Sequence, residues 1–260
     1  MSQNSKKERL EARAVSVYRT GVRVHWKGGG RPPRGRGEIK ELTPAARARL
    51  AFTAQNLEIE LTHMVTLTYP AEFPKDGALV KRQFNRLLSW MRSRAKPGKL
   101  GYLWFLEFQR RGAPHVHVLL DGVHWTHAEL SARWYAAVGS GDERHLRAGT
   151  RMERLRTADG AARYVTKYAT KTRQKSVPED YRSVGRFWGA SAGARPRVRA
   201  SYPVDGRGDL LERLAGWEFV GVLEDADYSN LFGAAGSIDV RGLPTIDLES
   251  GEVDVEGGSV

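Results

Sequence analysis

The chain alternates between the two hydrophobic periods that are typical of strands and of helices. Apolar residues at every second position, with β-branched and aromatic side chains, predict two short strands within 14–26 and further strands at 59–69, 102–109, 114–120 and 150–155. Stretches with helical spacing or a helix-starting residue predict helices at 43–56, 77–95, 126–138 and 158–171. This order favours an α+β fold in which a central antiparallel sheet carries helices mainly on one face, which leaves the other face for a site.

Two of the predicted helices carry clear local signals. Thr43 is a suitable N-cap, and Pro44 after it occupies the first helical position, where proline is favoured. In the helix at 77–95, one face is apolar and is expected to be buried; it consists of Val80, Phe84, Leu87, Leu88 and Met91.

The strands at 102–109 and 114–120 flank a polar turn, Arg110 to Ala113, and read as a β-hairpin. Side chains alternate across a strand, so His115 and His117 share one face. If the hairpin pairs Glu107 with His115, the two side chains lie directly opposite each other on that face, with Cβ atoms roughly 4.5–5.5 Å apart. Two imidazoles and a carboxylate can hold a divalent ion and leave positions open for water and a phosphate oxygen.

The helix expected at 158–171 carries two phenols and two ammonium groups at matched spacing. Tyr164 and Tyr168 are four residues apart and therefore lie on one face, and Lys167 and Lys171 repeat the same spacing. Tyrosines at this spacing often pack on a core, but this stretch is mostly polar. Neighbouring lysines lower the pKa of a phenol and neutralise phosphate charge, which suits a nucleophile.

Together these segments resemble the rolling-circle replication initiators of the HUH endonuclease superfamily. Met64 to Pro70 resembles the first motif of the family, and Glu107 with His115-Val116-His117 resembles its metal motif. The tyrosine helix resembles the nucleophile motif in its two-tyrosine form, and Gly185 to Gly189 resembles a segment of bacterial phage and plasmid initiators. The similarity covers roughly residues 60–190 and implies a sheet akin to the RNA-recognition-motif fold.

The resemblance implies a role for each motif residue. Glu107, His115 and His117 would hold Mg²⁺ or Mn²⁺, which polarises the scissile phosphate. Tyr164 would attack the phosphorus and form a 5′-phosphotyrosine bond, and Tyr168 would serve as the second nucleophile that rejoins the strand.

Two further pairs complete the site that the resemblance implies. Lys167 and Lys171 would stabilise the developing charge. Thr66 and Thr68 of the first motif are expected to contact the DNA.

The expected partners follow from the same chemistry. The substrate is single-stranded or extruded origin DNA, and a host polymerase extends the free 3′-hydroxyl. The chain contains no phosphate loop of the G-x-x-x-x-G-K-[ST] type, so unwinding would require a host helicase. Two alternatives stay open: a transposase of the same chemistry, and a non-catalytic basic protein that binds nucleic acid.

Charge agrees with a nucleic-acid partner. The net charge is +12, and because residues 223–260 hold nine acids and one base, residues 1–222 carry +20. The absence of cysteine excludes disulfide scaffolds and thiolate metal sites. No signal peptide or apolar span is visible, which favours a location in the cytoplasm of a bacterial host.

Changes in composition and charge along the chain predict three parts. Residues 1–57 form a basic extension with short strands and a helix, in which the loop from Lys27 to Gly37 is either a DNA contact or a linker. Residues 58–222 form the catalytic domain, whose late aromatic residues either stack on bases or pack in a core. Residues 223–260 form an acidic, Gly-rich tail that is expected to be disordered.

Overall fold

The computed structural model shows an α+β protein that divides into two compact units. Unit 1 comprises residues 1–35, 44–56 and 196–260, and unit 2 comprises residues 36–43 and 57–195. The structure describes residues 12–26, 41–96, 99–156, 165, 177–181, 184–214, 221–224, 228–232, 245–246 and 253–254. Each unit contains its own five-stranded antiparallel sheet.

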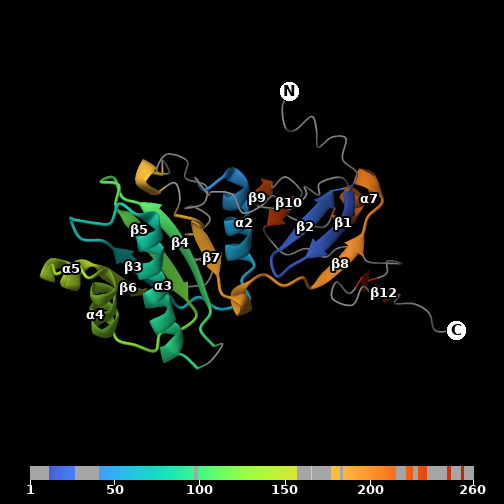
Figure 1. The fold of residues 1–260 in the computed structure, drawn as a ribbon. Coiled ribbons are helices and arrows are strands. Elements are labelled where there is room, and N and C mark those ends of the chain that lie inside the picture. Colours follow the sequence, from blue (N-terminus) through green and yellow to red (C-terminus); the bar gives the residue numbers. More distant parts are fainter. Residues whose placement is uncertain are drawn as a thin grey trace. The chain divides into compact units, whose positions relative to one another are not determined.

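The sheet of unit 2 has the strand order β6-β3-β5-β4-β7 (Figure 1). Its strands are β3 (His63–Thr68), β4 (Tyr102–Phe108), β5 (Pro114–Leu120), β6 (Thr150–Arg154) and β7 (Trp188–Ala190). Strand β5 lies at the centre and pairs with β3 on one side and β4 on the other. The two histidines of the metal motif therefore lie in the middle of the sheet.

Two helices cover one face of this sheet, α3 (Gly77–Arg94) and α4 (His127–Val138). The Phe84 ring of α3 packs against Trp104 of β4, and Ser131 of α4 is hydrogen-bonded to Thr150 of β6. Helix α5 (Glu143–Ala148) and two short 3₁₀ turns, η1 (Glu179–Tyr181) and η2 (Ala192–Ala194), complete the unit. The expected arrangement, with helices mainly on one face, is confirmed.

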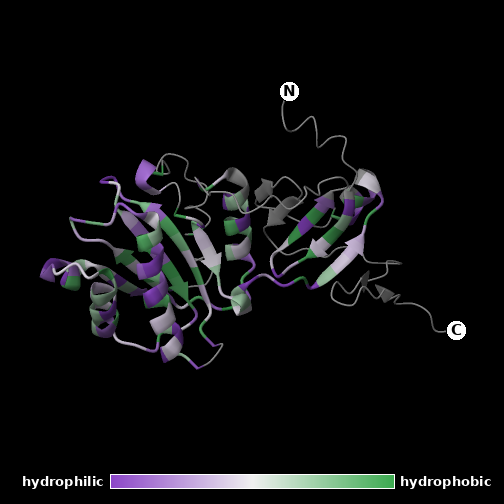
Figure 2. Ribbon diagram, viewed as in Figure 1, coloured by the Kyte–Doolittle hydropathy of each residue, from purple (hydrophilic) through white to green (hydrophobic). Residues whose placement is uncertain are grey.

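Helix α3 shows why this face is covered. All five apolar residues expected to be buried are buried, and much of the remaining surface of the helix is hydrophilic (Figure 2). The side chain of Asp76 accepts a hydrogen bond from the Ala78 backbone N–H and caps the start of the helix. An amphipathic helix of this kind is held mainly by the burial of its apolar stripe.

The predicted hairpin has the predicted register. Glu107 pairs with His115, and the two strands are joined by a turn in which the Gly112 N–H donates to the Gln109 carbonyl at 2.8 Å. Gly112 has a φ of 80°, a conformation that side chains rarely adopt, and so glycine is required there. Glu107, His115 and His117 therefore share the face opposite α3 and α4.

Unit 1 is built from strands that are far apart in the sequence. Its sheet has the order β8-β1-β2-β10-β9 and contains β1 (Ala12–Val17), β2 (Gly21–Trp26), β8 (Ala200–Pro203), β9 (Gly221–Glu224) and β10 (Tyr228–Phe232). Its helices are α2 (Pro44–Gln55) and α7 (Gly206–Arg213). A small core joins β1, β2 and α7, and it contains Val15, Val22, Val24, Val204, Leu210 and Leu214.

The two compact units divide the chain differently from the three predicted parts. The boundary near residue 222 moves to 195, because β8 pairs with β1 and so belongs with the N-terminal strands. The predicted disordered tail contains strands: β10 pairs with β2 and β9, and β11 (Thr245–Ile246) pairs with β12 (Val253–Asp254). The many acidic and glycine residues of this region favoured disorder, so the composition did not indicate these short strands.

Most of the other predicted elements are present, within a few residues of their expected ends. Several further elements were not predicted from the sequence, among them α5, β7, β8 and α7. Of the helix expected at 158–171, only Val165 lies within the described residues, and it is helical and fully buried. In the part of the chain that the structure describes, no helix has the length and apolar character needed to cross a bilayer.

Candidate active site

Three adjacent strands bring the polar residues of the first two motifs onto the face of the unit 2 sheet opposite α3 and α4. Thr68 pairs with His115, and Thr66 pairs with His117, across β3 and β5. Glu107 of β4 lies on the other side of His115. The first motif and the metal motif, which are about 50 residues apart in the sequence, are therefore directly adjacent.

The carboxylate and the imidazoles lie close together. Glu107 Oε1 is 3.7 Å from His117 Nε2, and the ring centroids of His115 and His117 are 4.6 Å apart at an angle of 83°. Phe105 stacks on the His117 ring with centroids 4.9 Å apart. The His117 ring is thus held between an aromatic face and its neighbouring histidine, and its Nε2 is directed toward the carboxylate.

The threonines of the first motif hold the histidine rings. The Thr66 hydroxyl lies 3.2 Å from His117 Nδ1, and the Thr68 hydroxyl lies 3.2 Å from His115 Nδ1. With Nδ1 occupied in each ring, Nε2 is the nitrogen left to bind an ion. Hydrogen bonds at the second ring nitrogen are a regular feature of metal-binding histidines, because they fix ring orientation and tautomer.

The backbone beneath His115 is fixed from the helical side. The Thr68 carbonyl accepts hydrogen bonds from Trp134 Nε1 at 2.9 Å and from His145 Nε2 at 3.0 Å, and the Thr68 N–H donates to the Gly149 carbonyl at 2.8 Å. Trp134 and His145 are both buried. The Thr68 hydroxyl that contacts His115 therefore belongs to a residue whose backbone N–H and carbonyl are both hydrogen-bonded.

Both histidines are neutral at physiological pH. Burial, together with the nearby His115, lowers the pKa of His117 to about 3. Burial, together with the Arg111 guanidinium, lowers the pKa of His115 below its ordinary value. Neutral imidazole is the form that binds a metal, so neither ring would have to lose a proton before an ion binds.

The donor chemistry fits a divalent ion, although the three donors do not yet converge. Carboxylate oxygen with imidazole nitrogen is a suitable donor set for Mn²⁺ and is compatible with Mg²⁺. Within the described ranges, no three His, Asp or Glu side chains stand close enough to form a metal-binding group. Glu107 and His117 are the assembled part of the predicted set, and His115 lies beside them.

The predicted nucleophiles lie outside the described residues. This applies to Tyr164 and Tyr168 and to Lys167 and Lys171. Their neighbour Val165 is fully buried and lies in the same unit as the histidines.

Reasoning from the sequence missed a contact that supports the hairpin. The Arg111 guanidinium donates to the carbonyls of Tyr69 and Pro70, each at 2.6 Å, and also lies over the Phe73 ring. It thereby joins the hairpin turn to the loop that follows β3. No sequence pattern identifies such a residue, because its partners are backbone carbonyls that every residue carries.

A second missed contact fastens the segment before β7. Lys81 of α3 lies 4.1 Å above the Trp104 ring and donates a hydrogen bond to the Arg186 carbonyl. The Gly185 to Gly189 segment, which the resemblance singled out, is therefore anchored to both α3 and β4. An unusual lysine within an amphipathic helix was its only signal.

Comparison with known proteins gives one match to a family model. A family model for replication-associated proteins of the ORF2 type matches residues 62–173, which is less than half of the chain. The match begins just before β3, includes the hairpin and extends through the tyrosine segment. No curated protein and no solved structure matches the chain. The matched region is therefore similar to replication-associated proteins, which is consistent with a rolling-circle replication initiator.

Proposed function

We propose that this protein initiates rolling-circle replication by nicking one DNA strand through a tyrosine and later rejoining it. The observation that carries the proposal is the polar cluster on the unit 2 sheet, where Glu107 approaches His117 and two threonine hydroxyls hold both imidazoles. The match of residues 62–173 to replication-associated proteins supports it independently.

Glu107, His115 and His117 would hold Mg²⁺ or Mn²⁺ on this face. The ion, when bound, would supply Lewis-acid stabilisation of the scissile phosphate. Thr66 and Thr68 would keep the Nε2 atoms directed at it, since their hydroxyls occupy the Nδ1 positions. This role replaces direct DNA contact as the principal task that we assign to the two threonines.

The reaction exchanges one phosphate ester for another, so it requires no external energy source. The phenolic oxygen of Tyr164 attacks phosphorus, the phosphorus–O3′ bond breaks, and the O3′ atom takes up a proton as the phenol loses one. The products are a 5′-phosphotyrosine and a free 3′-hydroxyl that a host polymerase extends. Tyr168 performs the second transfer, and Lys167 and Lys171 offset the charge that develops on the phosphate.

One observation favours the non-catalytic alternative. Since no complete metal-binding group occurs among the described residues, the histidines could serve only the sheet, and the basic chain would then bind nucleic acid without cutting it. The depth at which His117 is buried is compatible with that alternative.

The test is a nicking assay on supercoiled DNA that carries the chain's own gene with its flanking sequence, because initiators of this class act on the replicon that encodes them. The full chain is incubated with Mn²⁺, with Mg²⁺ or with a chelator. The expected result is a nicked circle that carries protein on its new 5′ end, in the metal samples alone.

Two variants separate the proposal from its alternative. Glu107→Gln keeps the size of the side chain and removes its charge, and it is expected to abolish nicking while DNA binding persists. Replacing Tyr164 and Tyr168 together by phenylalanine is expected to abolish the protein–DNA adduct. A shift in DNA mobility without any adduct from the unaltered protein, under every metal condition, would establish the binding protein and overturn the nickase.

A further inference from the structure

The helical layer of unit 2 carries a second feature with its own chemistry. Between α3 and α4 lies a hollow of about 700 Å³, which is the size of ordinary ligand sites. Trp90 forms part of it, and its partly exposed indole packs on the buried Trp125 with ring centroids 5.4 Å apart. The Trp90 ring in this hollow is therefore supported by its packing on Trp125.

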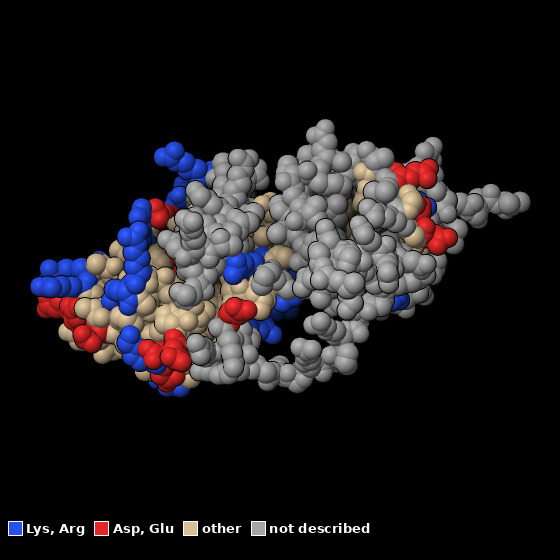
Figure 3. Space-filling view, turned by 90° about the horizontal axis from the view of Figure 1, so that it is seen from above, with Lys and Arg blue, Asp and Glu red and all other residues tan. Residues whose placement is uncertain are grey.

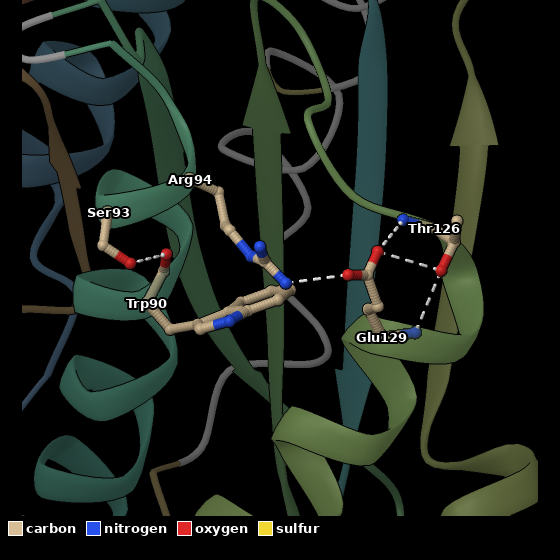
Figure 4. A network of polar contacts seen from close by, with 5 residues as sticks. All are labelled: Trp90, Ser93, Arg94, Thr126 and Glu129. Carbon is tan, nitrogen blue, oxygen red and sulfur yellow. Dashed lines mark hydrogen bonds and ion pairs between the residues drawn. The ribbon is translucent and has the colours of Figure 1, made fainter.

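Two guanidinium groups border this indole. Arg94 and Arg133 lie 5.8 Å and 5.9 Å from the Trp90 ring centroid. Arg94 is held in place by Glu129, whose Oε1 accepts its hydrogen bond at 2.8 Å (Figure 4). Arg133 is an exposed side chain from the opposite wall.

The one carboxylate among the residues that line the hollow is already engaged. Glu129 Oε2 accepts hydrogen bonds from the Thr126 N–H at 2.8 Å and from the Thr126 hydroxyl at 3.1 Å, and the Glu129 N–H donates to that hydroxyl at 3.2 Å, which completes the capping box of α4. Its other oxygen binds Arg94 (Figure 4). Because its charge is taken up by the cap and by one arginine, it repels an incoming anion only weakly.

The hollow continues a basic stripe along α3. Arg82, Arg86, Trp90 and Arg94 follow one another at intervals of four residues, so they lie along one side of the helix about 6 Å apart. Helices α3 and α4 together contain six basic residues and one acidic residue, a balance of +5. Figure 3 shows, from another direction, that Lys and Arg side chains also reach the surface of unit 2 elsewhere, with Asp and Glu among them.

We propose that this stripe and hollow form a second nucleic-acid site, which binds single-stranded DNA on the helical layer. The arginines bind successive phosphates, and an unpaired base stacks in the hollow on the aromatic and guanidinium surface that Trp90 and Arg94 provide. A duplex does not fit this description, since its base faces are covered by their neighbours. The site lies on the opposite side of the sheet from Glu107 and the histidines.

Such a site would hold one DNA strand on the helical layer while the strand to be nicked binds at the opposite face of the sheet. The inference does not require that the protein cuts DNA, because the binding is expected without any divalent ion.

The first test locates the strand by photochemical cross-linking. A single-stranded oligonucleotide of about 16 residues, the upper range of one such site, carries 5-iodouracil and is irradiated with the full chain in a chelator. The expected cross-link lies in the tryptic peptide of residues 87–92, which contains Trp90 and no other aromatic residue. Cross-links that occur only in other peptides would overturn the proposal.

The second test uses exposed arginines, so that folding is not at risk. Arg82→Gln with Arg86→Gln is expected to lower the slope of log affinity against log salt by about 1.4, which is about 0.7 for each phosphate contact on a single strand. The matched control changes Arg144 and Arg147, two exposed arginines of α5, and leaves the slope unchanged. Equal slopes for the two double variants would contradict the proposal.

A third variant tests stacking. Trp90→Leu keeps an apolar side chain against Trp125 but removes the ring, and it is expected to weaken single-strand binding about tenfold. Unchanged binding by this variant would refute the stacking role. If the unaltered protein cross-links single-stranded DNA in the peptide of residues 87–92 but nicks no DNA, the proposed function is refuted and this inference stands. If it nicks DNA but forms no such cross-link, this inference is refuted and the proposed function stands.

Discussion

The two threonines of the first motif connect a sequence pattern to the chemistry of the site. Sequence reasoning associated Thr66 and Thr68 with DNA, because they belong to a motif near the active site. The structure gives each hydroxyl a histidine Nδ1 as its partner. That contact could not be predicted, since it depends on β3 pairing with β5 in one particular register.

Removing these hydroxyls should weaken metal binding more than it weakens the fold. Thr66→Val with Thr68→Val preserves the shape of both side chains but leaves the imidazoles without their partners, and the affinity for Mn²⁺ is expected to fall about tenfold. Isothermal titration with Mn²⁺ measures the effect on the full chain. Serine at both positions restores the hydroxyls and should restore affinity; equal affinities for the valine and wild-type proteins would contradict the assigned role.

Arg111 is expected to contribute to stability through the loop that it fastens. Its hydrogen bonds to the carbonyls of Tyr69 and Pro70 are charge-assisted but partly exposed, so Arg111→Met should cost about 1–2 kcal/mol of unfolding free energy. Urea denaturation measures the change. The neighbouring Arg110→Met is the matched control and should have little effect; a loss as large in the control would show that charge alone is responsible.

At the scale of elements, the patterns that arise locally were predictable. The hairpin followed from two strand patterns around a short polar turn, its register is the one assumed in pairing Glu107 with His115, and the buried stripe of α3 followed from helical spacing. Helix α5 has six residues, too few to display a period, and depends on its Asp142 cap. The order of strands in the sheet, with β5 at the centre, depends on pairings between distant segments and was not visible in the sequence.

Strand β2 contributes a pH dependence. Burial, together with Arg23 and Arg13, lowers the pKa of His25 to about 4, while its Nε2 contacts the Ser16 hydroxyl at 2.8 Å. The unfolded chain therefore binds more protons than the folded chain between about pH 4 and the ordinary value of about 6.5. Stability from this residue is present above that window and is lost as the pH falls through it.

The variant His25→Gln tests this directly, because glutamine can bind Ser16 but does not titrate. Thermal unfolding at about pH 7 and about pH 4.5 should show a smaller loss of stability for the variant than for the wild-type protein. Equal losses would mean that His25 does not contribute to the acid sensitivity of the fold.

At the scale of the whole molecule, strands that are far apart in the sequence pair with each other, and composition does not reveal such pairing. Ser16 and Ser201 lie 185 positions apart and yet occupy paired positions in adjacent strands of unit 1. The acidic C-terminal region looked like a tail, although its first strands complete the N-terminal sheet. The unit that carries the histidines is accordingly shorter than expected and ends at residue 195.

The proposed function requires that the protein becomes joined to DNA through Tyr164 or Tyr168 in a reaction that depends on Glu107. The most direct measurement is peptide mass spectrometry of the full chain after reaction with Mn²⁺ and the supercoiled DNA that carries its gene, followed by nuclease digestion. The account predicts a nucleotide remnant on Tyr164 or Tyr168, absent from the Glu107→Gln protein. Nicked DNA with both tyrosines unmodified, or a remnant on a different residue, would contradict it.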